Sequence, residues 1–196
     1  MTIAKNRLLT LEEYLGYDDG TDRHNYELED GVLIEMAPEN PLNNTIVLFL
    51  INHFLNLRIP YYCFATNHHI QVTSEVVSAR QPDLIVHSEA SFAAILDDAR
   101  LLRFGLPAPT LVVEVVSSSD TSKVSRDRDY VRKRSEYAQR GISEYWIIDP
   151  IAAVVLVLTL TEGDYQEQKY VGEQRLRSLA FPNVELSAAQ VLQAGL

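Results

Sequence analysis

The stretch Leu111-Val-Val-Glu-Val-Val116 constrains the fold more than any other part of this chain. A continuous apolar run of strand length is typical of a central β-strand that is buried on both faces. Glu114 interrupts the run, and burying a bare carboxylate is costly unless it is ion-paired, protonated or bound to a metal. Glu114 is therefore a candidate functional residue, with a buried ion pair or a strand edge open to water as the alternatives.

A second acidic residue stands at the start of another apolar strand, which we expect over residues 82–87. Asp83 follows Pro82 directly, and a proline limits hydrogen bonding to the neighbouring strand. An aspartate that faces solvent at a strand start would explain Asp83 equally well. If the two strands are neighbours, however, the carboxylates of Asp83 and Glu114 can converge on one divalent cation. Ligands that are all oxygen favour Mg²⁺, or Mn²⁺ in its place.

Residues 127–139 have the pattern of a helix, with Gly141 just beyond its end. Asp129, Lys133 and Tyr137 are spaced i, i+4 and i+8, so they share one face of this helix. Asp129 and Lys133 could form a simple surface pair. If that face turns toward the end of the sheet, Lys133 can instead reach the metal site and stabilise charge on a phosphate.

Length and composition indicate one domain over residues 1–196, and the single cysteine, Cys63, excludes an internal disulfide or a cysteine-rich zinc site. The beginning of the chain lacks the apolar core of a signal peptide. No apolar run reaches the roughly 18–20 residues that a membrane span needs. We therefore expect a cytoplasmic protein that makes no use of a membrane.

The net charge of −10 argues against a protein that coats nucleic acid through general electrostatics. The charge is uneven, because residues 120–140 contain seven basic and four acidic side chains. A solvated helix face with ion pairs is the simpler explanation of that segment. The functional explanation is a local surface that binds nucleic acid through four arginines, Arg126, Arg128, Arg132 and Arg134.

An acid after a proline, an acid in an apolar strand and then a basic helix resemble the PD-(D/E)XK nuclease superfamily. The more specific resemblance is to the Uma2 family of restriction-endonuclease-like proteins, and it covers residues 10–184. The matching motifs are Thr10-Leu-Glu-Glu-Tyr-Leu15, Tyr26-Glu-Leu-Glu-Asp-Gly31, Met36-Ala-Pro38, Gln81-Pro-Asp83, Val113-Glu-Val-Val-Ser117, Asp129…Lys133…Tyr137 and Glu144-Tyr-Trp-Ile-Ile-Asp-Pro150. The resemblance implies an α/β (α+β) fold with a restriction-endonuclease-like three-layer core, in which helices flank a mixed central β-sheet.

The resemblance also implies a site in which Asp83 and Glu114 bind Mg²⁺, with the Val115 carbonyl as a further ligand. Glu27 resembles an additional acid of the site. The superfamily has a lysine two residues after the glutamate, and Val116 stands there in this chain. The resemblance places the lysine on the helix instead, at Lys133, with Lys123 as a weaker candidate.

A second departure concerns the start of the first long helix, where many relatives carry a histidine and this chain has Asn43-Asn44. That difference weakens any proposal that the histidine serves in catalysis, but it does not affect the acids that would bind the metal.

Three functions remain open from the sequence. The first is a Mg²⁺-dependent endonuclease that hydrolyses DNA phosphodiester bonds. The second is a non-catalytic module with a nuclease fold that binds nucleic acid or protein, which the missing lysine and the net acidity favour. The third is a self-assembly domain, in which the apolar strand over residues 152–160 pairs with its copy in a homodimer. That strand could equally be internal to one sheet.

Overall fold

The structure is a computed structural model that describes residues 8–20, 25–36, 40–73, 78–96, 101–117 and 128–194. The first helix, α1 (Leu11–Leu15), begins at a capping box in which Thr10 and Glu13 satisfy each other's backbone amides. A hairpin of β1 (Asn25–Glu29) and β2 (Val32–Met36) follows, as the Asp30-Gly31 pair predicts. Both turn residues have positive φ, 49° and 76°, which is the geometry of the tight turn preferred in hairpins.

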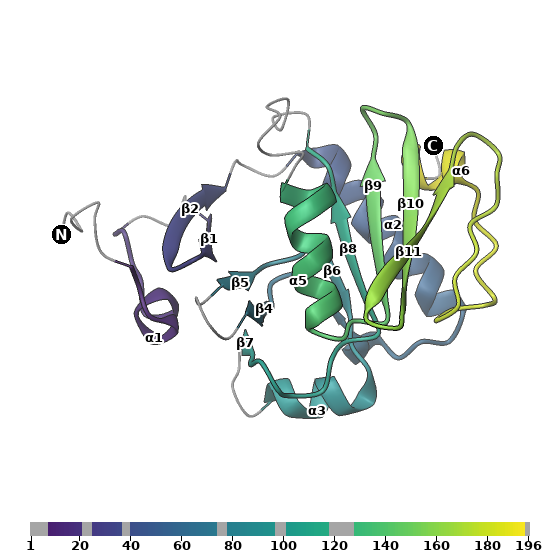
Figure 1. Cartoon of the computed structure of the whole chain (residues 1–196). Coiled ribbons are helices and arrows are strands. Elements are labelled where there is room, and N and C mark those ends of the chain that lie inside the picture. The colour runs from purple at the N-terminus through teal and green to yellow at the C-terminus, as the bar shows by residue number, and fades with distance from the viewer. Residues whose placement is uncertain are drawn as a thin grey trace.

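The hairpin belongs to a five-stranded sheet at the N-terminal end of the molecule, with the order β2-β1-β5-β4-β7 (Figure 1). Its other strands are β4 (His69–Thr73), β5 (Ser78–Arg80) and β7 (Leu101–Leu102). One face packs against α1 through a small apolar cluster that includes Leu11, Tyr14 and Leu28. Successive side chains of a strand point to opposite faces, so Glu27 and Glu29 point away from that cluster.

A six-stranded mixed sheet forms the centre of the protein, with the order β11-β10-β9-β8-β6-β3. The strands are β3 (Phe64–Ala65), β6 (Leu84–Val86), β8 (Leu111–Val115), β9 (Glu144–Asp149), β10 (Val154–Thr161) and β11 (Asp164–Tyr170). Strands β8 and β9 are parallel, and the remaining neighbours are antiparallel. Every residue of β8 is buried, which confirms the expected central strand.

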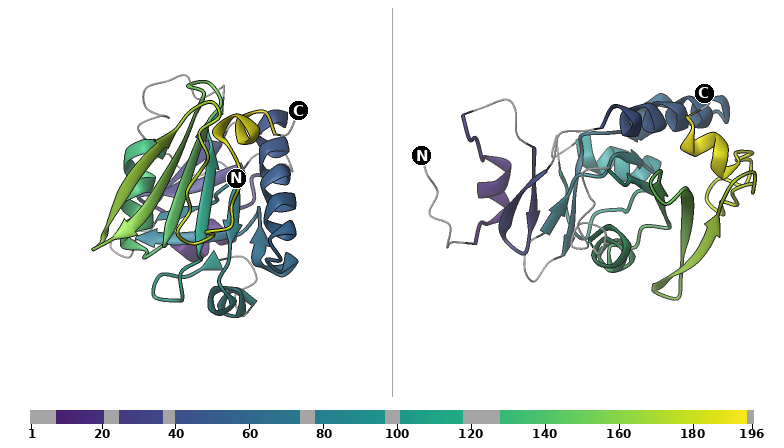
Figure 2. Two further views of the ribbon diagram at one scale, coloured as in Figure 1. Left: turned by 90° about the vertical axis from the view of Figure 1, so that its right-hand side faces the viewer. Right: turned by 90° about the horizontal axis from the view of Figure 1, so that it is seen from above.

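Helices cover both faces of the central sheet, so the fold has the expected three layers (Figure 2). The long helix α2 (Pro41–Asn56) covers one face, where Ile46 and Leu50 join a core cluster with Val113 of β8. The helix α5 (Lys133–Gln139) covers the opposite face, where Tyr137 joins Val112 of the same strand. The strand β8 therefore alternates its side chains between two cores.

Several elements differ in extent from the sequence-based expectation. The helix expected over residues 127–139 begins as a π-helical turn, Arg128–Arg132, before it becomes α5. Residues 61–72, whose β-forming side chains predict a strand region, contain a 3₁₀ turn, Tyr61–Cys63, before β3 and β4. Residues 91–102, which the sequence pattern predicts as a small insert with one helix, lie in α3 (Glu89–Leu96) and then β7, which completes the N-terminal sheet.

The strand β10 pairs with β9 on one side and with β11 on the other. Its backbone is therefore internal to the sheet, and the pairing with a second copy through residues 152–160 is wrong for this strand. The outer strand on that side of the sheet is β11, which presents exposed polar and charged side chains.

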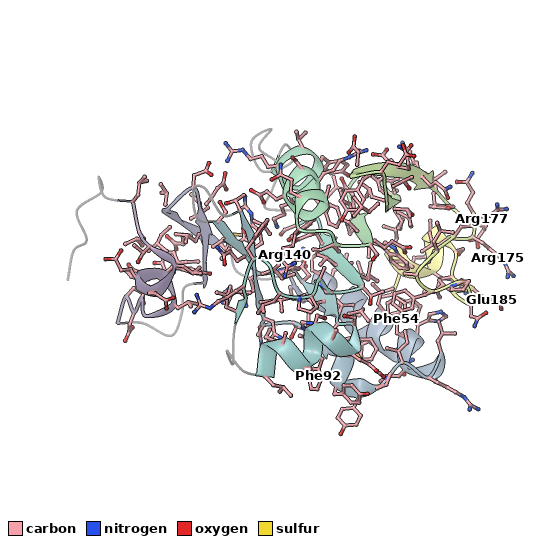
Figure 3. The ribbon with its side chains drawn as sticks, turned by 60° about the horizontal axis from the view of Figure 1, so that its bottom comes forward. Phe54, Phe92, Arg140, Arg175, Arg177 and Glu185 are labelled. Atoms are coloured by element: carbon pink, nitrogen blue, oxygen red, sulfur yellow. The ribbon has the colours of Figure 1, made fainter. Side chains whose placement is uncertain are left out.

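The segment after β11 folds back over the central sheet and ends in α6 (Ala188–Leu192). The buried carboxylate of Glu144 holds this segment, because it accepts hydrogen bonds from the backbone amides of Leu179 and Ala180 at 3.0 and 3.1 Å. The exposed Arg175, Arg177 and Glu185 lie at the end of the molecule opposite the N-terminal sheet (Figure 3).

Candidate active site

Asp83 and Glu114 lie beside each other at one end of the strands β6 and β8. The two strands pair with Leu84 opposite Val113, and one further step in that register places Asp83 opposite Glu114. Residues that stand opposite each other in an antiparallel pair point to the same face. Oδ2 of Asp83 also accepts a hydrogen bond of 2.6 Å from the Val115 amide. The structure thus brings the two acids together, and it gives Asp83 a backbone partner rather than leaving it simply in solvent.

The Glu114 carboxylate is buried and has two strong partners on α5. Its Oε1 accepts a hydrogen bond of 2.7 Å from the Tyr137 hydroxyl, and its Oε2 lies 2.9 Å from Nζ of Lys133. Burial, followed by the charge of Glu114, raises the pKa of Tyr137 well above its ordinary value, so the phenol remains a donor. The buried ion pair that the sequence left open as an alternative is therefore present.

Lys133 also approaches Glu27, with its Nζ 3.7 Å from Oε1 of that carboxylate. Glu27 also contacts the segment that leads into β6. Its Oε1 accepts a hydrogen bond of 3.1 Å from the Gln81 amide, and its Oε2 accepts one of 3.2 Å from Arg80. Glu27 therefore connects the lysine to the segment that carries Asp83.

Arg80 is a residue of this region that sequence reasoning missed. Its fully buried guanidinium makes two hydrogen bonds of 2.8 Å to Glu136 and one of 3.1 Å to Glu29. Burial lowers its pKa, but the hydrogen bond to Glu136 and the charge of Glu27 outweigh burial, and the net pKa is raised. The available signal was a basic residue three positions before Asp83, directly ahead of the Gln81-Pro-Asp83 motif.

The arginines expected to bind nucleic acid have different surroundings. Arg132 is more than half exposed and pairs with Glu29. Arg134 makes a hydrogen bond of 2.9 Å to Glu167 and one of 2.6 Å to the Tyr165 carbonyl. Arg126 and Lys123 lie outside the described residues, and so do the side chains of Arg128 and Asp129.

The residue two positions after Glu114 is a valine, so in this chain that position brings no ammonium to the site. Val116 is buried in the apolar cluster beneath α5, together with Val112 and Tyr137. Lys133 is the basic side chain that contacts the Glu114 carboxylate, although it comes from a helix rather than from the strand. Sequence reasoning singled out Lys133 through its helical spacing with Tyr137 and through the family resemblance, because nothing local to Glu114 indicates it.

The oxygen donors of Asp83 and Glu114 suit a hard divalent cation. Within the described parts of the chain, no three His, Cys, Asp or Glu side chains gather as a complete set of ligands. Mg²⁺ in proteins commonly uses one or two carboxylates and keeps several waters or substrate oxygens. Two neighbouring carboxylates are therefore a fitting donor set for this ion.

Comparisons with known proteins identify the family and the fold of this chain. The family model named Uma2, described as "Putative restriction endonuclease", matches residues 11–189. The fold is similar to a crystal structure described as "a putative nuclease belonging to DUF820 from Anabaena variabilis ATCC 29413". That match has a TM-score of 0.71 at 17% identity, and it covers 96% of this chain and 99% of the other. No curated protein matches the chain.

None of the helices in the described ranges has the length and apolar character required to span a membrane.

Proposed function

This chain belongs to the Uma2 family, and on that basis we propose that it is a cytoplasmic, Mg²⁺-dependent endonuclease that hydrolyses DNA phosphodiester bonds. The observation that carries the proposal is the meeting of Asp83, Glu114 and Lys133, which come from three separate elements, at one end of the central sheet. Two acids and a lysine together are the groups that phosphodiester hydrolysis needs, because charge must be stabilised on the phosphate and on the attacking water.

Asp83 and Glu114 would hold the ion. Bound there, Mg²⁺ would polarise the scissile phosphate and lower the pKa of a water molecule. Val115 follows Glu114 in the chain and donates its amide to Asp83, and its carbonyl is a further candidate ligand.

Lys133 has the task of stabilising negative charge. Its Nζ lies 2.9 Å from the Glu114 carboxylate and 3.7 Å from that of Glu27. A fixed positive charge beside the phosphate would stabilise the charge that develops during hydrolysis. Tyr137 keeps the second oxygen of Glu114 in place, since its hydroxyl donates to Oε1. Glu27 forms an ion pair with Lys133 and accepts a hydrogen bond from the Gln81 amide.

The basic segment would guide the DNA backbone toward this site. Arg132 has the most exposed side chain of the described arginines in this segment, and its carboxylate partner Glu29 is itself bound by Arg80. We propose Arg126, Arg128 and Arg134 as further residues that bind DNA. Binding through such contacts releases counterions, so affinity for DNA should fall as the salt concentration rises.

The direct test is nicking of supercoiled plasmid DNA in the presence of Mg²⁺. The wild type should convert the plasmid to open circles, and Asp83→Ala and Glu114→Ala should each slow that conversion by at least about 100-fold. Glu185→Ala is the matched control, since it removes an exposed carboxylate from the opposite end of the molecule. Equal cleavage by all four proteins would eliminate this site.

One observation favours a second candidate, a nuclease fold that binds nucleic acid or protein without cleaving it. Glu114 is already neutralised by Lys133 and held by Tyr137, so the buried carboxylate is stable without an ion. Calorimetry with Mg²⁺ or Mn²⁺ separates the candidates. Metal binding that depends on Asp83 and Glu114, without cleavage of DNA, would support this second function.

A further inference from the structure

Val115, the residue after Glu114, has both of its backbone polar groups bound by side chains. Its amide donates to Asp83 at 2.6 Å, and its carbonyl accepts a hydrogen bond of 2.9 Å from Nδ2 of Asn43. We propose that Asn43 is a positioning residue of the carboxylate site, because it fixes the backbone from which Glu114 projects. This inference rests on the proposed metal-dependent function of that site.

The need for a side-chain donor at Val115 follows from the strand pairing. The Val116 amide donates to the Ile148 carbonyl of β9, so the polar groups of Val115, one residue earlier, point the other way, toward β6. The register of β6 and β8 places Pro82 opposite Val115. Proline has no N–H group, so the strand that should donate to the Val115 carbonyl has no donor there. A buried carbonyl without a donor is costly, and Asn43 supplies the missing hydrogen.

Asn43 is well placed to donate this hydrogen bond to the Val115 carbonyl. The residue is buried in the first turn of α2, which begins after the N-cap Asn40 with Pro41 at the first helical position. The Val115 carbonyl can only accept, so the amide nitrogen of Asn43 must face it. Ile46 and Leu50 pack the following turns of α2 against the sheet and hold Asn43 at this depth.

This single hydrogen bond links the site to the helix on the far side of the sheet. Lys133 and Tyr137 reach Glu114 from α5, whereas Asn43 reaches the neighbouring peptide from α2. Asp83 holds the N–H of the peptide between Glu114 and Val115, and Asn43 holds the C=O of the next peptide. The backbone on both sides of Val115 is therefore held, and with it the direction in which Glu114 projects relative to Asp83. A carbonyl oxygen has two lone pairs, so the bond from Asn43 orients it without using its whole capacity to accept.

The test measures Mn²⁺ binding to the full chain by titration calorimetry, with thermal unfolding recorded in parallel. Asn43→Ala should raise the dissociation constant for Mn²⁺ about 10-fold, as is usual when a group that orients metal ligands is removed. The same variant should lower the unfolding temperature by about 2–4 °C through the lost hydrogen bond.

Two control variants separate positioning from a general loss of stability. Asn44→Ala changes the next residue of α2, which is exposed, and should leave the dissociation constant unchanged. Ser187→Ala removes the side-chain cap of α6 and should cost similar stability, again without changing Mn²⁺ binding.

The outcomes distinguish this inference from the proposed function. If Mn²⁺ binds to the wild type and not to Asp83→Ala, and Asn43→Ala binds as tightly as the wild type, the role of Asn43 is overturned and the metal site stands. The same conclusion follows if Ser187→Ala weakens binding as much as Asn43→Ala does. If the wild type binds no Mn²⁺ at all, both the metal-dependent function and the role of Asn43 are overturned.

Discussion

Nζ of Lys133 lies 2.9 Å from Oε2 of Glu114, and both side chains are almost completely removed from water. The pair joins a helix to the central strand of the sheet, so it affects the stability of the fold as well as the chemistry of the site. The contribution of the pair to stability can be measured separately from its contribution to the chemistry of the site. Substitutions can remove the charge of one partner or the charges of both.

Lys133→Met should lower the free energy of unfolding by about 3–5 kcal/mol, since it leaves Glu114 buried without its cation. Adding Glu114→Gln in the same chain should recover part of that loss, because the uncompensated charge disappears while Gln retains an oxygen for the Tyr137 hydroxyl. Urea denaturation of the two single variants and the double variant checks this. Additive losses, with no recovery in the double variant, would contradict a direct pair.

A lysine at position 116 offers a second test of the site. Val116 and Glu114 are two residues apart in extended backbone, so their side chains share one face. The double variant Val116→Lys/Lys133→Met should therefore return an ammonium to Glu114 from the strand. We expect nicking of supercoiled plasmid to fall at least about 100-fold in Lys133→Met and to recover about 10-fold in the double variant.

Val116→Lys alone is the control for that experiment. It adds a buried ammonium next to Lys133, and like charges in an apolar cluster should destabilise the protein. Nicking that is unaffected by Lys133→Met would show that the helix lysine has no part in hydrolysis.

Glu144 should be the main structural carboxylate of the central sheet. It is completely buried and accepts hydrogen bonds from the Trp146 indole at 2.6 Å and from the amides of Leu179 and Ala180. Glu144→Ala leaves these three donors without their acceptor and should cost roughly 3 kcal/mol of stability. Urea denaturation followed by fluorescence of Trp146, the only tryptophan in the chain, measures it. Glu185→Ala, at an exposed position, should change stability by less than about 0.5 kcal/mol.

The buried His87 should make stability fall in acid. Burial, followed by the proximity of His68, lowers the pKa of His87 from 6.5 to about 4. Between these values the unfolded chain binds a proton that the folded protein does not, so stability decreases as the pH falls from 6.5 toward 4. The group adds no further loss below its folded pKa.

We expect His87→Gln to remove up to about 3 kcal/mol of that decrease, although it disturbs the hydrogen bond to Ser91 at all pH values. Chemical denaturation at several pH values between 4 and 7 gives the slope for each protein. Identical slopes for the wild type and His87→Gln would contradict a neutral, buried imidazole.

Much of the local structure could be read directly from the residues. The capping box at Thr10, the hairpin turn at Asp30-Gly31 and the buried strand around Glu114 each depend on short-range patterns that survive in the fold. The boundaries were less predictable at residues 127–139, where a π-helical turn precedes α5, because the periodicity of side chains does not distinguish two closely related helices.

The sequence by itself determined which residues would be unusual: two acids in apolar strands and a lysine on a helix face that it shares with a tyrosine. Only the tertiary structure decided which partners they have. Arg80 meets Glu27 and Glu136 across 53 and 56 residues, and Asn43 meets the Val115 carbonyl across 72. Contacts at such separations depend on strand order, register and the face that each helix covers, and no local pattern of residues encodes them.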